Sequence, residues 1–252
     1  MISVLGVNVC ETNYLSATSQ IRTWALAGES RGVIATGVHG VMEAYDSLAF
    51  KNILNSADIV TPDGMPLVWM LRLKGVKGQT RVYGPTLMLY LVEMAAREKI
   101  PVGFYGSTDQ TLQKLIERLR DLYSGLQVVY AFSPPFRPLD EKESAKIAQE
   151  ITTSGVRILF VGLGCPKQEK WMAEKKGQIH AVMLGVGAAF DFHAGTKSQA
   201  PSWMQAIGLE WFFRLIHEPR RLAKRYLYNN PRFILLALAD LLGILERGKK
   251  EA

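Results

Sequence analysis

The chain has 252 residues, of which 48% are hydrophobic and 21% are charged. This composition excludes wholesale disorder, and the length is sufficient to bury a substantial core. The formal net charge of +7 indicates an acidic partner, a class that includes nucleic acid, anionic lipid and phosphorylated substrates.

The N-terminal sequence and the cysteines carry no sign of secretion. The start, MISVLGVNVCETNYLSA, lacks the basic residues and long apolar segment of a signal peptide, so we expect a cytoplasmic protein. The two cysteines, Cys10 and Cys165, stand far apart, which argues against a disulfide framework. Cys165 lies in a glycine-rich stretch, where we interpret it as a small buried filler rather than a reactive thiol.

Short β-rich runs alternate with helical patterns over most of the chain. The expected strands cover residues 2–9, 32–37, 57–62, 101–106, 126–132, 156–164 and 179–187. Apolar residues recur at helical spacing over 86–99, 110–124 and 140–155. This alternation predicts an α/β, Rossmann-like fold with a mainly parallel sheet, in which ligands bind beyond the C-terminal ends of the strands.

The pattern changes near residue 197, after which only helices are expected. Trp203, Ile207, Trp211 and Leu215 recur every four residues and predict one apolar stripe on one helix. We therefore predict a catalytic core over 1–196 and a helical appendage over 197–252. The apolar run 233–245 contains Asp240 and is too short to span a bilayer, so it is expected to lie on a membrane without crossing it.

Asp63 follows an apolar strand candidate in the segment TPDGMP and opens a helix. One interpretation is an N-cap or Asx-turn, because aspartate serves both roles well. The other is a catalytic carboxylate at a strand end that removes a proton from an acceptor hydroxyl.

Two glycine-rich segments are expected at the same edge of the sheet. GFYGST contains Tyr105 and Gly106, and GLGCPKQ contains Gly164, Pro166, Lys167 and Gln168. Each is explained equally well by a tight strand-to-helix turn or by a ligand contact, and neither fits the dinucleotide fingerprint or the P-loop. Glycines that let the backbone approach a ligand, beside a helix start, favour a phosphate or sugar-nucleotide pocket.

Two further segments have competing interpretations. GVGAAFDFHAG contains Asp191 and His193, and we expect Asp191 to form a structural or substrate hydrogen bond rather than to bind a metal. The basic run EPRRLAKRYLYNNPR is a solvated helix face by default. Because it adjoins an apolar run, it also fits a helix that lies in a membrane interface.

Taken together and in order, several motifs closely resemble the WecG/TagA/CpsF family of bacterial glycosyltransferases, glycosyltransferase family 26. They are ATGVHGVMEA, TPDGMPLVW, RVYGPTLM, GLGCPKQEKWM and the long C-terminal GVGAAFDFHAGTKSQAPSWMQAIGLEWFFRLIHEPRRLAKRYL. The resemblance implies an inverting, metal-independent enzyme without a cofactor. It would move a sugar from a UDP-sugar to a polyprenyl-diphosphate-linked saccharide at the inner face of the cell membrane, in the synthesis of surface or exported polysaccharide.

The resemblance also implies roles for individual residues. The family's proposed base falls on Asp63 and its strand-end threonine on Thr36. The motif RVYGPTLM would place Arg81 and Gly84 in the substrate site, where Arg81 is suited to holding diphosphate. The motif glutamine falls on Gln168, a candidate contact with the donor. The basic helix would bring three arginines to phosphate groups of the acceptor or leaving group: Arg214, Arg221 and Arg225.

The sequence departs from the family pattern at two places near the expected pocket. Thr36-Gly37-Val38, followed by His39, stands where many members have Thr-x-Asn, and Thr86 stands where many have Asp. A hexose or uronic acid donor therefore has equal weight with an N-acetylmannosamine-type donor.

Two other function classes and one assembly hypothesis stay open. The basic helices also suit a non-catalytic module that binds RNA or an anionic membrane, although the stacking aromatics of common RNA modules are missing and we expect no nucleic-acid partner. A nucleotide-dependent oxidoreductase lacks its fingerprint. The parallel sheet edge and apolar helices could support a homo-oligomer.

Overall fold

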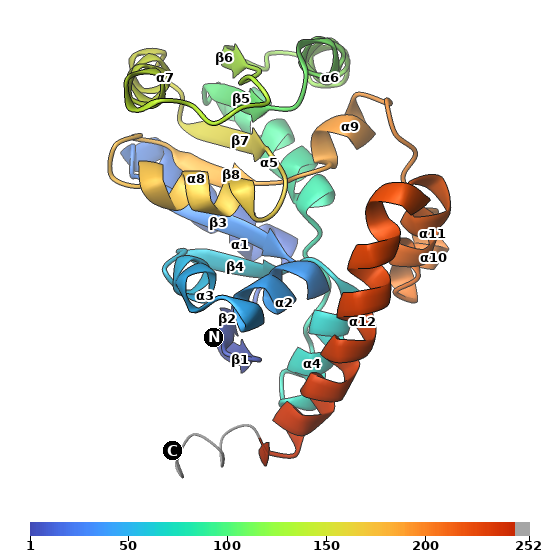
Figure 1. The fold of residues 1–252 in the computed structure, drawn as a ribbon. Helices are drawn as coiled ribbons and strands as arrows, with labels where there is room; N and C mark the ends of the chain where they lie inside the picture. The colour runs from blue at the N-terminus through green and yellow to red at the C-terminus, as the bar shows by residue number, and fades with distance from the viewer. Residues whose placement is uncertain (245–252) are drawn as a thin grey trace.

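The computed structural model describes residues 1–244 and centres on one six-stranded sheet (Figure 1). The strand order is β4-β3-β8-β7-β5-β6, and every neighbouring pair is parallel. The predicted α/β fold with a parallel sheet is therefore confirmed. The strands are β3 (Arg31–Thr36), β4 (Ile59–Pro62), β5 (Val102–Gly106), β6 (Val128–Phe132), β7 (Ile158–Gly162) and β8 (Val182–Gly185).

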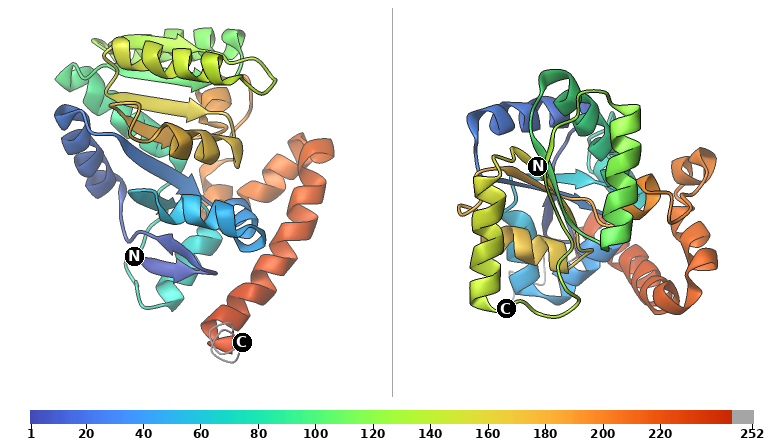
Figure 2. Two further views of the ribbon diagram at one scale, coloured as in Figure 1. Left: turned by 60° about the vertical axis from the view of Figure 1, so that its left-hand side comes forward. Right: turned by 90° about the horizontal axis from the view of Figure 1, so that it is seen from above.

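Helices cover both faces of the sheet, because its central strands are apolar on both sides (Figures 1 and 2). One core packs Phe104 and Phe160 of the sheet under α1 (Tyr14–Ala27), α5 (Gly84–Glu98), α6 (Asp109–Leu122) and α9 (Ala189–His193). The other packs Tyr105 and Leu159 with α2 (Val38–Asp46), α3 (Leu48–Asn55), α4 (Met65–Leu73), α7 (Glu141–Thr153) and α8 (Lys167–Lys175).

The first expected strand, over residues 2–9, is instead a short hairpin. β1 (Ile2–Val4) pairs antiparallel with β2 (Val7–Val9), and the turn places both Leu5 and Gly6 at positive φ, 51° and 86°. Val4, Val7 and Val9 are fully buried. The hairpin adds to the core beside β4 and is not a strand of the main sheet.

After α9 the described chain contains helices only: α10 (Ser202–Ala206), α11 (Glu210–His217) and α12 (Pro219–Leu241). The prediction of a single helix with one apolar stripe is wrong. The chain turns at Gly208, where φ is +75°, so Trp203 and Ile207 lie before the break and Trp211 after it. Trp203 and Ile207 are 60% and 54% exposed, which shows that no continuous stripe is buried.

α12 runs along the side of the core (Figure 2). Two ion pairs, at different points along the helix, hold it there. Arg232 forms a two-pronged ion pair with Asp46 at 2.7 and 2.9 Å, and Asp240 pairs with Lys74 at 2.8 Å. Phe233 is buried in the second core. Asp240 therefore serves as a tether between α12 and the core.

No helix within residues 1–244 is both long enough and apolar enough to cross a membrane. Residues 245–252, which belong to the predicted appendage, lie outside the described chain. The division into a catalytic core and a membrane-associating appendage stays a prediction.

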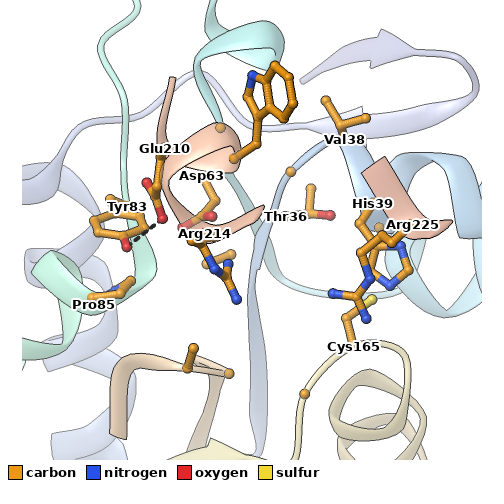
Figure 3. A pocket seen from close by; sticks show the side chains of 18 of the residues that line it. Thr36, Val38, His39, Asp63, Tyr83, Pro85, Cys165, Glu210, Arg214 and Arg225 are labelled. Carbon is orange, nitrogen blue, oxygen red and sulfur yellow. Dashed lines mark hydrogen bonds between the residues drawn. The ribbon is translucent and has the colours of Figure 1, made fainter. Parts of the chain in front are cut away.

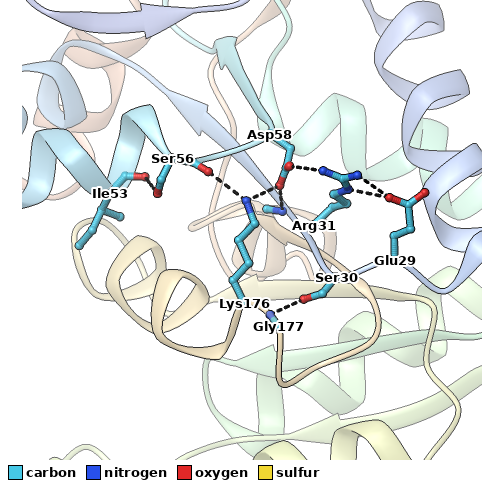
Figure 4. Close-up of polar contacts among 9 residues, drawn as sticks. Glu29, Ser30, Arg31, Ile53, Ser56, Asp58, Lys176 and Gly177 are labelled. Carbon is cyan, nitrogen blue, oxygen red and sulfur yellow. Dashed lines mark hydrogen bonds and ion pairs between the residues drawn. The ribbon is translucent and has the colours of Figure 1, made fainter.

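A charged network ties three segments together at the sheet edge opposite the strand C-termini (Figure 4). Asp58, before β4, accepts from Lys176 and from Arg31, each at 2.8 Å, and from the Gly32 N–H at 2.8 Å. Burial alone would raise the pKa of Asp58, but the hydrogen bonds from Lys176, Gly32 and Arg31 outweigh it and lower that pKa.

Replacing Asp58 with asparagine is expected to reduce the free energy of unfolding by about 1–3 kcal/mol at pH 7, because Lys176 and Arg31 lose their anionic partner. The folded pKa of Asp58 is below the reference value of 3.8, so the difference from wild type is complete above that pH and shrinks as the pH falls through the folded pKa. Urea unfolding across pH tests this. Asp121→Asn, on the exposed face of α6, is the matched control and should change little.

Candidate active site

A cavity of about 440 Å³ lies at the C-terminal ends of β3, β4, β7 and β8 (Figure 3). Residues just beyond those strands form one wall, and residues of α10, α11 and α12 form the other. This is the edge at which open parallel sheets bind ligands, and the volume is typical of small-molecule sites.

The cavity brings together most of the residues predicted from the sequence, although they come from segments that are distant along the chain. Those that line it are Thr36, Asp63, Arg81, Gly164, Pro166, Lys167, Gln168, Arg214, Arg221 and Arg225.

Four residues predicted to bind substrate do not line the cavity. Tyr105 is buried and stacks on Trp171 with 4.4 Å between ring centroids. Gly106 packs so closely on the backbone of Gly162 that a Cβ would lie 2.6 Å from it. Two others have protein partners: Gly84, whose N–H donates to Asp63, and Asp191, which pairs with Lys197 at 2.9 Å.

Asp63 sits immediately after β4, at the centre of the cavity edge. Its Oδ1 accepts a hydrogen bond of 2.6 Å from the N–H of Gly84, at the start of α5. The N-cap of α4 is Gly64, and no side chain caps that helix. The N-cap interpretation of Asp63 is therefore wrong, because its carboxylate accepts a hydrogen bond from the Gly84 N–H and not from the first turn of α4.

The electrostatic surroundings of Asp63 favour its protonated form. Burial is the largest influence on the Asp63 pKa and raises it. Arg81, the Gly84 N–H and Arg214 act in the opposite direction, while the carboxylate of Glu210 raises the pKa further. The net effect is a pKa above the reference value of 3.8, which makes Asp63 a stronger base than an ordinary aspartate.

Each nitrogen of the Arg81 guanidinium has a partner in the protein. Nε donates to the backbone carbonyl of Asp63, one terminal nitrogen donates to Glu210 at 2.5 Å, and the other lies 3.4 Å from the Gln205 side-chain oxygen. The guanidinium also stacks over the Tyr83 ring, 3.8 Å from its centroid. Arg81 thus joins Asp63 to α10 and α11 in this structure.

Arg214 and Arg225 line the cavity without an ion pair to any residue in 1–244. Figure 3 shows Arg225 beside His39 and Cys165, and both Arg214 and Arg225 lower the pKa of His39. Arg221 differs, because it pairs with Glu218 at 2.7 Å and its side chain is 51% exposed. Two partly buried guanidinium groups that form no ion pair with the described residues give this wall of the cavity a positive charge suited to an anion.

Gln168 is only 3% exposed, and its amide joins two loops. The side-chain oxygen accepts from the N–H groups of Gly164 and Gly187, at 3.1 and 3.0 Å, and the nitrogen donates to Glu169 at 2.9 Å. Lys167 beside it is exposed. Gln168 shapes the cavity wall here, and its contact with a donor stays a prediction.

Several residues that line the cavity were not predicted from the sequence as site residues: Tyr83, Glu210, Trp211, Tyr226 and Asn229. His39 follows the departure that was expected near the pocket, and it does line the cavity. Burial, together with Arg225 and Arg214, lowers the pKa of His39 to about 4, so its imidazole is neutral at pH 7. Burial also raises the pKa of the Cys165 thiol, which disfavours a reactive thiolate. Cys165 is nevertheless only partly buried and lines the cavity, so it is not the buried filler that the sequence predicted. The motif GLEWFFRL contains Glu210 two residues after the break at Gly208, but nothing local indicated its partner.

Within the described residues, no group of three or more His, Cys, Asp and Glu side chains is placed to hold a metal ion. The charged residues that line the cavity include the acids Asp63, Glu169 and Glu210, together with Lys167 and the arginines Arg81, Arg214, Arg221 and Arg225.

Comparison with known proteins agrees with this arrangement. Residues 2–247 match the family described as "Glycosyl transferase WecG/TagA/CpsF family". The chain is 30% identical over 197 residues to the N-acetylglucosaminyldiphosphoundecaprenol N-acetyl-beta-D-mannosaminyltransferase of Bacillus spizizenii, covering 78% of this chain and 74% of that protein. The Bacillus subtilis (strain 168) protein of the same name is 30% identical over 202 residues, covering 80% and 74% of the two chains. The match over nearly the whole chain and the 30% identity to these relatives show that the chain belongs to the WecG/TagA/CpsF family of glycosyltransferases.

Proposed function

We propose that the protein transfers a sugar from a UDP-sugar to a polyprenyl-diphosphate-linked saccharide, with inversion at the anomeric carbon and without a metal ion. The product would serve the synthesis of bacterial cell-surface or exported polysaccharide. The enzyme would work at the inner face of the cell membrane, where such a lipid-linked acceptor is held.

One observation carries this proposal: a single cavity places the carboxylate of Asp63 on the sheet side and the unpaired guanidinium groups of Arg214 and Arg225 on the helical side. Transfer from a nucleoside diphosphate sugar needs a base for the acceptor hydroxyl and positive groups for the departing diphosphate. Groups of both kinds line one cavity of about 440 Å³, which supports this assignment.

In the proposed reaction, Asp63 accepts the proton of an acceptor hydroxyl as its oxygen attacks the anomeric carbon. The bond from that carbon to the UDP oxygen breaks on the opposite face, so a single displacement inverts the anomeric configuration. The negative charge that develops on the leaving diphosphate is stabilised by Arg214 and Arg225, the role that a metal ion fills in other transferases.

The names of the two Bacillus relatives support an N-acetylglucosaminyl-diphosphoundecaprenol acceptor and an N-acetylmannosaminyl donor as the first substrates to test. The first departure from the family pattern, Gly37 and Val38 followed by His39, lines the cavity, whereas Thr86 does not. Because Val38 stands where many members have an asparagine, hexose and uronic acid donors belong in the same test.

Attachment to a membrane is supported by the apolar side chains that α11 and α12 expose. Ile216, Leu227 and Leu235 are 61%, 70% and 69% exposed, and Arg220 and Lys224 are exposed on the same helices. Apolar side chains beside basic ones are typical of helices that bind anionic lipid surfaces.

The proposal is tested by incubating the protein with a panel of UDP-sugars and a polyprenyl-diphosphate-linked N-acetylglucosamine in vesicles. The product is analysed by mass spectrometry, and the coupling constant of its anomeric proton gives the configuration of the new bond. We expect one donor to yield an elongated lipid with inverted configuration. A product with retained configuration would contradict the single-displacement mechanism, and salt-dependent RNA binding without any product would favour a basic binding module.

The pH dependence of transfer should report the raised pKa of Asp63. The base accepts a proton only when it is ionised, so kcat/KM falls as the pH drops through that pKa. Because the pKa lies above 3.8, the acidic limb of the profile is expected above the value for an ordinary aspartate. An acidic limb at or below 3.8 would mean that Asp63 is not the titrating base.

A further inference from the structure

Glu210 is the residue through which the C-terminal helices reach the base. It lies at the start of α11, and its two carboxylate oxygens have different partners on the segment before α5. Oε2 accepts from Arg81 at 2.5 Å, and Oε1 accepts from the Tyr83 hydroxyl at 2.8 Å (Figure 3). The side chains of Arg81 and Glu210 are only 14% and 13% exposed, so solvent weakens this bridge little.

The bridge connects directly to the backbone that carries the base. Arg81 donates from Nε to the carbonyl of Asp63, while the N–H of Gly84 holds the Asp63 side chain at 2.6 Å. Glu210, Arg81, Tyr83 and Gly84 thus form one hydrogen-bonded frame around Asp63. Displacing Glu210 removes the fixed partner of both Arg81 and Tyr83.

The same bridge determines where the phosphate-binding arginine stands. Arg214 is one helical turn after Glu210 on α11, so the two side chains share a face of that helix. When Glu210 is held by Arg81 and Tyr83, Arg214 is directed at the cavity beside Asp63. α11 is short and has no buried residue, and apart from its packing against α12, polar contacts such as this bridge connect it to the core.

We propose that Glu210 is a positioning residue, which docks α11 on the core and so brings Arg214 and Asp63 into one reaction site. This inference rests on the proposed function and deepens it, because it makes the helical wall and the base parts of one assembled unit. Glu210 itself touches no reacting atom.

The charges around Asp63 predict the direction in which the pH profile shifts when Glu210 is changed. The groups that act on the Asp63 carboxylate are Arg81, Glu210, Arg214 and the N–H of Gly84, with the phenols of Tyr83 and Tyr14 also facing it. Glu210 raises the pKa of Asp63 through like-charge repulsion. Glu210→Gln keeps the size of the side chain but removes that charge, so the acidic limb of the rate profile should move to lower pH.

Three variants test the inference in the full-length protein. Glu210→Gln is expected to lower kcat/KM roughly 10- to 100-fold, the cost of misplacing catalytic groups by about an ångström, and to move the acidic limb downward. Glu210→Asp keeps the charge but is shorter, so it should retain the acidic limb while losing rate. Glu98→Gln breaks another inter-helix glutamate–arginine pair, with Arg22 at 2.7 Å and far from the cavity, and should match wild type.

Hydrogen–deuterium exchange supplies a readout that needs no substrate. In Glu210→Gln, amides of residues 210–217 should exchange faster, while those of α6 stay at the wild-type rate. Unchanged exchange in 210–217 overturns the docking role whether or not the wild type shows transferase activity, so failure here is distinct from failure of the proposed function. A lower rate in Glu210→Gln with an unmoved acidic limb would also overturn the inference. So would tighter UDP binding with unchanged kcat, because Glu210 would then be competing with the diphosphate for Arg81.

Discussion

Asparagine at position 63 is expected to lower kcat by about 10²- to 10⁴-fold, the usual contribution of a positioned general base. The amide keeps the size of the carboxylate and retains an oxygen for the Gly84 N–H, but it does not accept a proton from the acceptor hydroxyl. Binding of UDP should change much less than kcat, because the groups proposed to hold the diphosphate are on α11 and α12. Steady-state kinetics and calorimetric titration with UDP measure the two effects separately.

The control for this variant is Asp121→Asn, which makes the same chemical change on the exposed face of α6. It should show wild-type kinetics. Far-UV circular dichroism and urea unfolding establish that the Asp63→Asn protein is folded. A folded Asp63→Asn enzyme that turns over its own substrates at the wild-type rate would remove Asp63 from the mechanism.

The second large effect is expected from the unpaired arginines of the cavity. Arg214→Ala and Arg225→Ala should each lower kcat by about 10²- to 10³-fold, the typical loss when one group that stabilises developing charge is removed. Since both arginines act on the same leaving group, the double variant should lose less than the product of the single losses. Arg225→Lys should restore activity only in part, because an ammonium does not reproduce the two-pronged hydrogen bonding of a guanidinium.

Arg220→Ala is the matched control, since Arg220 is exposed on the same helix and does not line the cavity. In vesicles it should affect membrane binding more than the chemical step, and in detergent with a soluble acceptor analogue its kcat should equal that of wild type. If Arg220→Ala lost as much kcat as Arg225→Ala in detergent, the arginines would act through net charge and not through the cavity.

Local sequence patterns predicted the sheet well and the details of its ends poorly. Strong apolar runs such as 156–164 fix buried parallel strands, because such segments are stable only when covered on both faces. The hairpin at the N-terminus was missed because a turn of Leu5 and Gly6 is short and interrupts no apolar pattern. The helical stripe failed at Gly208, where a positive φ redirects the chain despite favourable spacing.

Site residues were predicted where the family resemblance implied a role for them, whereas Tyr83 and Glu210 lie in the same motifs but were missed, because their tertiary contacts define them. Asp63 and Arg214 lie in motifs that resemble a known family, so they could be placed in advance. The Tyr83–Glu210 hydrogen bond joins residues 127 positions apart, and no periodicity encodes such a pair. For the same reason the N-cap interpretation of Asp63 failed, since its partner Gly84 is 21 residues away.

The most direct test of a metal-independent transferase is UDP release by the purified protein in vesicles, measured with the best donor, with and without acceptor, and with and without EDTA. We predict release that requires the acceptor, is unchanged by EDTA and is lost in Asp63→Asn. Release that EDTA abolishes and Mg²⁺ or Mn²⁺ restores would contradict the role given to the arginines. Silence with every donor in a folded protein would contradict the proposed transfer itself.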